Sequence, residues 1–286
     1  MDFIKELRIK WITGSMLIKL VFVNVAIFLL LHLLTFILGF TSVSPESVLA
    51  LVELPSDFSS FLSVPWTIVS YMFSQYDLLH ILFNMLWLYW FGEIFLFADS
   101  SKRMLALYLY GGIGGGLLFM TWYSLLGMYG LIIGSSASVL AIVVATAVRH
   151  PEFKMNLLFL GEISLKWVAI ATIVIDFLSI GGSNAGGHIA HIGGAVVGLC
   201  YAVAQKYGVD ITRPYCVAVD RMVNLRNRLF DKKYKFYGAK PSFHSAKSKN
   251  DEACLDEILD KVKKSGYGSL TKQEKDRLFD VSRRIK

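Results

Sequence analysis

The sequence predicts an all-α membrane protein, a bundle of six transmembrane helices followed by a small helical cytoplasmic C-terminal tail. Of its 286 residues, 55% are hydrophobic, and the mean hydropathy is +0.52; both values are rare in a soluble domain of this size. The apolar residues gather in blocks of roughly twenty, the length that an α-helix needs to cross a bilayer. Positive charges fall in alternate links between these blocks, which is typical of a multi-span topology.

Six apolar blocks are long enough, or nearly long enough, to be the membrane spans. They cover residues 17–40, 79–97, 103–124, 133–148, 166–181 and 187–205. The first block is too long for the core of a signal peptide, and no small-residue cleavage site follows it, so we expect no separate signal peptide. No mitochondrial-type presequence is evident, and a bacterial inner membrane is the expected location.

The distribution of charge orients these spans. Lys and Arg occur in the N-terminal head, after the second and fourth blocks and after the sixth block, whereas the links 41–78, 125–132 and 182–186 contain none. Cytoplasmic loops carry such an excess, so both termini are expected in the cytoplasm. The net charge of +7 then reflects the attraction of the cytoplasmic face to anionic lipid, and no nucleic-acid partner is predicted.

The chain is expected to form a six-span membrane domain, 1–206, and a basic cytoplasmic tail, 207–286. The link 41–78 is too apolar for a solvated loop, and we expect it to lie partly embedded in the outer membrane interface. The cysteines show no paired spacing and are expected to be reduced thiols without a structural role. They are Cys200, Cys216 and Cys254.

The tail is expected to be flexible at first and then helical. The flexible stretch covers about 239–250, and two short amphipathic helices follow at 251–265 and 271–284. Thr271 and Glu274 have the spacing of a capping box, in which the two side chains bind each other's backbone N–H groups at the start of a helix. The purpose of this appendage is not indicated by any motif.

Polar side chains lie near the start of three spans, where they are costly in lipid and usually functional. The second span carries His80 and Asn84, four residues apart and therefore on one helix face. The fourth span begins with GSSAS, residues 134–138, and the sixth carries His188 and His191. In the predicted topology these three helices all run from outside to inside. Their polar groups are therefore expected at one depth, just below the outer surface.

Small residues recur on the third, fourth and sixth spans at a spacing that lets membrane helices approach closely. They are Gly111, Gly112, Gly115 and Gly116; Ala137, Ala141 and Ala145; and Gly194, Ala195, Gly198 and Ala202. Close approach of the fourth and sixth spans brings a serine hydroxyl beside an imidazole, and a neighbouring base activates serine as a nucleophile. Free backbone N–H groups at the start of the fourth span, with His80 and Asn84, suit an oxyanion.

These residues resemble the motifs of the rhomboid intramembrane serine proteases. HILFN, residues 80–84, matches HxxxN on the second helix of the family. GSSA, residues 134–137, stands where the family has GxSG, and AHIGGAVVG, residues 190–198, matches AHxxGxxxG on the sixth helix. The resemblance covers about residues 15–205. It implies a rhomboid-like fold and a serine endopeptidase that cleaves single-pass transmembrane proteins near the outer membrane face.

The resemblance also implies the role of each residue. Ser136 is the nucleophile and His191 the general base of a dyad that has no acid partner, while His80, Asn84 and the Ser136 N–H line the oxyanion hole. The motif of small structural residues is Gly134, Ala137, Gly194 and Gly198. The fifth helix and the loop after it form a lateral gate for the substrate. No metal, nucleotide or other cofactor is required.

Two positions depart from the family's pattern. Ala137 stands where the family has glycine, and it adds a methyl group beside the nucleophile. Leu140 stands where some members have an aromatic ring under the histidine, so that packing alone is expected to support His191. Neither departure removes a catalytic group.

Other hypotheses remain open. His80, His188 and His191 offer three ligands to a metal ion, although no HExxH motif or acidic ligand accompanies them; otherwise His188 is expected to face the outer loop. Asp176 is expected to line a wet cavity or to bond a neighbour, and Glu93 to pair with a loop cation. A rhomboid-like protein without activity that binds membrane clients is a second function, although such relatives lack the serine or histidine. A channel or transporter is a third, although charged midplane residues are missing.

Overall fold

The computed structural model describes residues 2–44, 46–157, 161–182 and 184–236, together with residues 258, 261, 270, 271 and 274. The chain forms two compact units, Met1–Arg221 and Met222–Lys286. The elements in chain order are α1 (Asp2–Thr13), α2 (Met16–Leu38), α3 (Glu46–Leu49), β1 (Leu54–Pro55), α4 (Phe58–Ser63), α5 (Thr67–Ser70), η1 (Tyr71–Phe73), α6 (Leu78–Ala98), α7 (Ser101–Leu126), β2 (Leu131–Ile132), α8 (Ser136–Arg149), β3 (Lys154–Leu157), β4 (Gly161–Ser164), α9 (Leu165–Leu178), α10 (Ala185–Lys206) and α11 (Arg213–Phe236).

The long apolar helices agree with four of the predicted spans. Among the described residues, α2, α6, α7 and α10 are long and apolar enough to cross a membrane. The other two predicted blocks form the shorter helices α8 and α9, of 14 residues each. At 1.5 Å per residue, 14 residues measure about 21 Å, which is less than the roughly 30 Å of a bilayer's hydrocarbon core. Neither helix is therefore long enough by itself to cross the whole hydrocarbon core.

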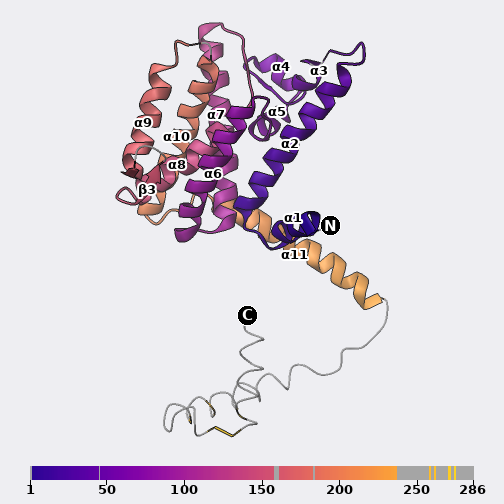
Figure 1. The fold of residues 1–286 in the computed structure, drawn as a ribbon, viewed down its shortest axis with the longest axis vertical. Coiled ribbons are helices and arrows are strands. Elements are labelled where there is room, and N and C mark those ends of the chain that lie inside the picture. Colours follow the sequence, from indigo (N-terminus) through magenta and orange to yellow (C-terminus); the bar gives the residue numbers. More distant parts are fainter. Residues whose placement is uncertain are drawn as a thin grey trace. The chain divides into compact units, whose positions relative to one another are not determined.

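Helix α8 is the buried centre of the first unit. Every residue from Ala137 to Ala147 is buried, and α6, α7, α9 and α10 all contact it (Figure 1). The predicted close approach of α8 and α10 is present, since Gly194 and Gly198 lie directly against the backbone of Ala137 and Ala141. Gly115 of α7 lies where α7, α8 and α10 meet, since an added Cβ would come within 2.6 Å of both the Ala137 side chain of α8 and the Ala190 carbonyl oxygen of α10. Glycines of both α7 and α10 thus allow close packing against α8.

The predicted interfacial link holds the loop that precedes α8. Strand β1 pairs antiparallel with β2, with Leu54 opposite Ile132. The Gly134 N–H donates a 3.0 Å hydrogen bond to the carbonyl oxygen of Tyr71, whose side chain is fully buried. The backbone entering α8 is therefore anchored to a segment more than sixty residues earlier in the chain.

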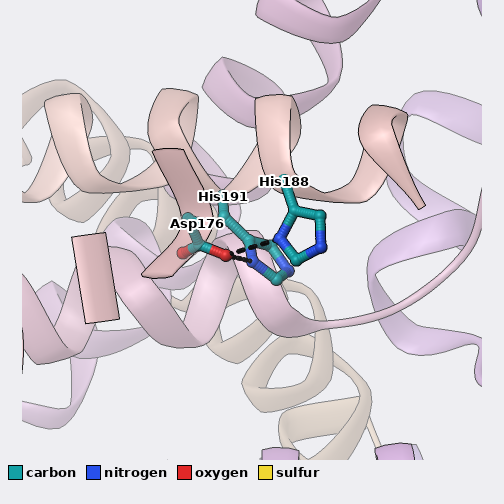
Figure 2. Close-up of side chains that lie close together, drawn as sticks. All are labelled: Asp176, His188 and His191. Carbon is teal, nitrogen blue, oxygen red and sulfur yellow. Dashed lines mark hydrogen bonds and ion pairs between the residues drawn. The ribbon is translucent and has the colours of Figure 1, made fainter. Parts of the chain in front are cut away.

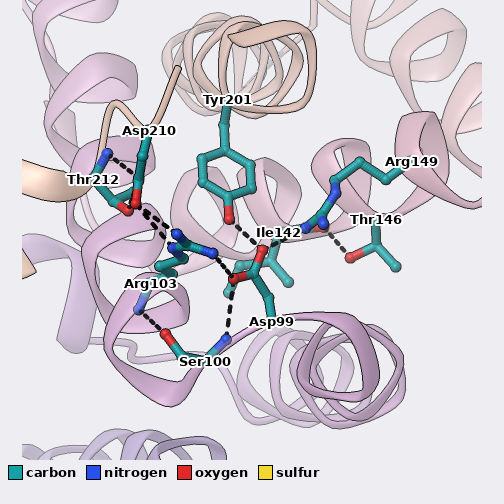
Figure 3. Close-up of polar contacts among 9 residues, drawn as sticks. All are labelled: Asp99, Ser100, Arg103, Ile142, Thr146, Arg149, Tyr201, Asp210 and Thr212. Atoms are coloured by element: carbon teal, nitrogen blue, oxygen red, sulfur yellow. Dashed lines mark hydrogen bonds and ion pairs between the residues drawn. The ribbon is translucent and has the colours of Figure 1, made fainter. Parts of the chain in front are cut away.

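A buried carboxylate joins the helices at the end of the unit where α6 and α8 terminate (Figure 3). The Asp99 side chain is 0% exposed and lies 3.0 Å from Arg103 Nη1; it also contacts Arg149 and the Tyr201 hydroxyl. Burial alone would raise the pKa of the Asp99 carboxyl, but hydrogen bonds from Tyr201, Arg103, the Ser100 N–H and Arg149 together outweigh burial and hold the pKa below its ordinary value. The expectation for Glu93 is wrong: Glu93 is exposed and forms no ion pair with any residue in the described ranges, and Asp99 pairs with the cations instead.

The tail differs from its prediction in one described segment. No helix was predicted between the last span and the flexible stretch 239–250, but α11 is a continuous helix over Arg213–Phe236. Pro214 lies in its first turn, a position that tolerates proline because the first N–H groups of a helix have no partner within it. The stretch 239–250 lies outside the described residues, as do most residues of the two predicted short helices.

Two described residues of the second unit test the predicted capping box. The Thr271 N–H donates to Glu274 Oε2 at 2.7 Å, and the Glu274 N–H donates to Thr271 Oγ1 at 3.3 Å. The capping box is therefore confirmed. Of the cysteines, Cys200 and Cys216 are free thiols, and Cys254 lies outside the described residues.

Candidate functional site

Ser136 is placed by the turn that leads from β2 into α8. It is the first residue of α8, so the N–H groups around it have no partner within the helix. Gly134, two residues earlier, has φ +139°, and a Cβ at this position would lie 2.7 Å from His80 Cε1 and 3.7 Å from Ser136 Oγ. Only glycine fits this approach. Gly134 therefore lets the His80 ring and the Ser136 hydroxyl lie on one side of the turn.

His191 lies directly opposite Ser136. Its Nε2 is 2.5 Å from Ser136 Oγ, although 55 residues separate the two along the chain. The next residue of α8, Ala137, is the one against which Gly194 of α10 packs, one helical turn beyond His191. The close contact between the two helix backbones therefore sets the distance between the serine and the imidazole.

Asp176 of α9 holds the far side of the imidazole (Figure 2). Its Oδ1 lies 2.7 Å from His191 Nδ1 and 2.8 Å from His188 Nδ1, and its side chain is 6% exposed. Three expectations are corrected by this geometry. His191 does have an acid partner, its support is not packing alone, and His188 contacts Asp176 instead of the outer loop. The second carboxylate oxygen, Oδ2, is buried and has no hydrogen-bond partner within the described part of the chain.

The contacts of His191 with Asp176 and Ser136 indicate which of its two ring nitrogens carries the proton in the neutral imidazole. An aspartate carboxylate only accepts hydrogen bonds, so Nδ1 of His191 carries the proton and donates it to Asp176. In the neutral imidazole, Nε2 is then the acceptor, and the Ser136 hydroxyl donates to it. A serine whose hydroxyl donates to an oriented base has the arrangement of an activated nucleophile.

The same three residues could also hold a metal ion. Ligand atoms of Asp176, His188 and His191 all lie within 4.8 Å of one another, whereas His80, the third ligand in the metal hypothesis, is not in this set. Two ligands about 2.05 Å from a tetrahedral zinc ion lie roughly 3.3 Å apart. The 2.7 and 2.8 Å separations between oxygen and nitrogen are those of hydrogen bonds. The arrangement in the structure is therefore a hydrogen-bonded one.

Asn84 lines the site and is the last member of a buried network of polar side chains. No sequence motif indicated the other members of this network. Its Nδ2 donates to Gln75 Oε1 at 2.6 Å, and Gln75 Nε2 donates to Asn24 Oδ1 at 3.1 Å. Asn24 in turn donates to the Tyr108 hydroxyl at 3.2 Å. Asn24 and Gln75 are fully buried. An amide NH₂ has two hydrogens, so Asn84 keeps one for another acceptor.

A small cavity lies beside the serine. Its volume is about 140 Å³, and it lies between α6 and α9 above α8. Ser136, His191 and Asn84 line one part of it, and most of the other lining residues are apolar. The other lining residues are Phe83, Trp87, Val139, Leu140, Val143 and Thr172. The nucleophile is thus reachable from the gap between α6 and α9, in a mostly apolar surrounding.

Comparison with known proteins gives two family matches. Residues 63–207, slightly more than half of the chain, match the family described as "Rhomboid domain". Residues 243–284 match a "Family of unknown function (DUF6576)". The first match contains Ser136, His191, Asp176, His80 and Asn84; the second lies in the tail.

Three similar proteins carry related names. The chain is 30% identical over 133 residues to "Presenilin-associated rhomboid-like protein A, mitochondrial" of Danio rerio, covering 45% of this chain and 34% of that protein. It is 30% identical over 147 residues to "RHOMBOID-like protein 12, mitochondrial" of Arabidopsis thaliana, covering 46% and 44%. It is 25% identical over 142 residues to the human "Presenilin-associated rhomboid-like protein, mitochondrial", covering 49% and 37%. The matched part thus spans less than half the length of each of these relatives.

Proposed function

Since the chain belongs to the rhomboid domain family, we propose that it is an intramembrane serine endopeptidase that cleaves single-pass transmembrane proteins near the outer membrane face. The observation that carries the proposal is the 2.5 Å separation between Ser136 Oγ and His191 Nε2. The cavity between α6 and α9 supports lateral entry of the substrate. The mostly apolar lining of this cavity suits a substrate that arrives through lipid. Membership of the rhomboid domain family agrees with such a substrate.

The proposed reaction is acyl transfer to Ser136. His191 Nε2 takes the hydroxyl proton as Ser136 Oγ bonds to the carbonyl carbon, and the electron pair of the C=O bond moves onto the oxygen. The Ser136 N–H, His80 and the free N–H of Asn84 stabilise this oxyanion. When the carbonyl re-forms, the peptide nitrogen leaves with the proton from His191. Water then cleaves the acyl-enzyme by the same route and restores Ser136.

We further propose how the multi-pass protein lies in its membrane. Helices α8 and α9 complete six spans with the four long helices, residues 1–206 form the membrane domain, and residues 207–286 form a cytoplasmic tail. Both termini face the cytoplasm, because positive charge is restricted to the links on that side. The bacterial inner membrane was the expected location, but the three relatives above have names that place them in mitochondria and give that expectation no support.

Covalent labelling tests the activity directly. A fluorophosphonate probe should label purified wild-type protein and should not label Ser136→Ala or His191→Ala. Wild-type protein reconstituted in liposomes should also cleave a single-pass substrate that has small or helix-breaking residues near its outer end. Absence of labelling and cleavage in folded wild-type protein would contradict the proposal and favour the binding of membrane clients without proteolysis.

A further inference from the structure

Asp176 has no role in a mechanism in which Ser136 is the nucleophile and His191 the general base. It is a carboxylate on α9, a 14-residue helix of otherwise mostly apolar side chains, and it is buried. An ionisable group in a membrane segment is costly unless it is paired. A neutral polar residue could join α9 to α10 at a lower cost, so the charge itself needs an explanation.

We propose that Asp176 is a positioning residue for His191, so that the protein works with a Ser136–His191–Asp176 triad. This inference rests on the proposed proteolytic function. Asp176 accepts the Nδ1 proton of His191, holds the imidazole in the tautomer that leaves Nε2 free for Ser136, and stabilises the imidazolium that forms during attack. It does not touch the substrate.

The geometry supports each part of this role. His191 contacts Asp176 at 2.7 Å through one ring nitrogen and Ser136 at 2.5 Å through the other. The order carboxylate, imidazole and hydroxyl is that of the Ser-His-Asp arrangement, which recurs on unrelated folds. The three groups come from three helices, α9, α10 and α8, so none of the contacts follows from local helix geometry.

His188 gives the carboxylate its own orientation. It contacts the same oxygen, Oδ1, from one turn before His191, and a carboxylate oxygen has lone pairs for both donors. The two imidazoles together fix the direction of Asp176, whose other oxygen has no described partner. His188 is thus a support for Asp176 and not a second base.

The deciding variant is Asp176→Asn. Asparagine has the same size and keeps a carbonyl oxygen that can accept from both histidines, so a purely structural Asp176 predicts nearly normal kcat. A positioning role predicts a fall in kcat of about 10² to 10⁴ with KM changed less than about twofold, because the amide can also donate to Nδ1 and stabilise the wrong tautomer. The rate of fluorophosphonate labelling should fall in parallel. Ile175→Ala, the neighbouring residue on α9 that is 60% exposed, should leave kcat and the labelling rate unchanged.

The outcomes separate this inference from the proposed function. If wild-type protein is labelled, Ser136→Ala is not, and Asp176→Asn has normal kcat, the positioning role is overturned while the protease remains. If wild-type protein is neither labelled nor active, both are overturned.

A second measurement covers the case in which Asp176→Asn does not fold. Nitrogen-15 NMR of histidine-labelled wild-type protein, with His191→Ala to assign the signal, should show neutral His191 protonated at Nδ1. The opposite tautomer would contradict the inference.

Discussion

At the residue scale, the site depends on side chains that leave each other very little room. The Ser136 hydroxyl, the His80 ring and the turn at Gly134 meet within one small volume, and the backbone at Gly134 has a φ of +139°. A residue with a Cβ rarely adopts this conformation. The geometry of the oxyanion donors is therefore determined by the absence of a side chain at one position.

Gly134→Ala should lower activity about 10²-fold while the protein still folds. The added Cβ would lie 2.7 Å from His80 Cε1, so the ring or the turn must shift, and a displacement of about 1 Å at a reacting centre costs on the order of 10²-fold in rate. Fluorophosphonate labelling and substrate cleavage measure this loss. Gly127→Ala is the matched control, since Gly127 also has a positive φ, 63°, but nothing lies within 4 Å of an added Cβ. Equal losses of activity in both variants would show that backbone strain, and not contact with His80, is responsible.

Gln75→Leu should lower kcat because it releases Asn84. Gln75 Oε1 accepts one hydrogen of the Asn84 amide, and this bond directs the second hydrogen toward the cavity. We expect kcat to fall about tenfold or more, and the free energy of unfolding to fall by about 1–3 kcal/mol because buried polar groups lose partners. Asn24→Leu removes the next bond of the same network but leaves the bond between Gln75 and Asn84 intact. It should lower stability by a similar amount with a much smaller effect on kcat, and similar kcat values in the two variants would contradict the role of Gln75.

At the element scale, α8 is a short helix that packs against glycines of both α7 and α10. Because glycine has no side chain, the backbones of α8 and α10 touch at Ala137 and Ala141, and small residues in membrane helices allow such close packing. Backbone cannot rotate away from an added methyl group as a side chain can. The distance between the two helices is therefore a fixed property of the bundle.

Gly194→Ala should separate α8 from α10 at the site. The new methyl group would collide with the carbonyl of Ala137, directly beside Ser136, and move His191 away from it. We expect a loss of kcat of about 10² or more together with a lower melting temperature in detergent. Val203→Ala, on the same helix and 41% exposed, should change neither. Normal activity in Gly194→Ala would show that the bundle adapts to the methyl group and that this contact does not set the distance.

Local patterns in the sequence predicted the helices better than they predicted the contacts between them. Apolar blocks indicated α2, α6, α7 and α10, and the stripes of small residues indicated which helices approach closely. Helix α11 was missed because it contains no apolar block, although its apolar residues recur at helical spacing. The capping box of Thr271 and Glu274 was predicted, since it depends on only four consecutive residues.

The contacts of the site were harder to predict for a physical reason. The motifs brought Ser136 and His191 together, and the structure places them 2.5 Å apart. Asp176 stands alone in an apolar helix, and nothing near it in the sequence indicates that it meets His191. The same holds for Gln75, which lies in the link before α6. Such pairings depend on how whole helices pack and rotate, and single-residue patterns carry no information about that.

At the scale of the whole membrane unit, the site and the Asp99 cluster lie at opposite ends of the same helices. Helix α6 carries Asn84 near its start and ends next to Asp99, while α8 begins at Ser136 and ends at Arg149. Asp99 joins the ends of α6 and α8 to Arg103 of α7 and Tyr201 of α10 (Figure 3). The cluster thus joins four helices at the end of the unit that is far from Ser136 and His191.

Asp99 should make the stability of the protein depend on pH in the acid range. An unperturbed aspartate has a pKa of about 3.9. The pKa of Asp99 in the folded protein is lower, because hydrogen bonds from Tyr201, Arg103, the Ser100 N–H and Arg149 outweigh the effect of burial. A carboxyl with a depressed pKa contributes stability that is fully present above the unfolded pKa and is lost as pH falls through the folded pKa. The melting temperature in detergent should therefore be constant from about pH 7 to pH 5 and fall below about pH 4.

Asp99→Asn should remove that contribution at neutral pH. Arg149, 23% exposed, loses its carboxylate, whereas Arg103 keeps its pair with Asp210. The cost should therefore lie between the roughly 0–1 kcal/mol of an exposed pair and the roughly 3–5 kcal/mol of breaking a fully buried one. The variant should melt at a markedly lower temperature at pH 7, and its melting temperature should change less than that of the wild type as the pH is lowered. Asp220→Asn is the matched control: Asp220 pairs with Lys102 at the surface, with both side chains about half exposed, and exposed pairs contribute only about 0–1 kcal/mol. If the two variants lose the same stability at pH 7, the Asp99 cluster does not hold the four helices together.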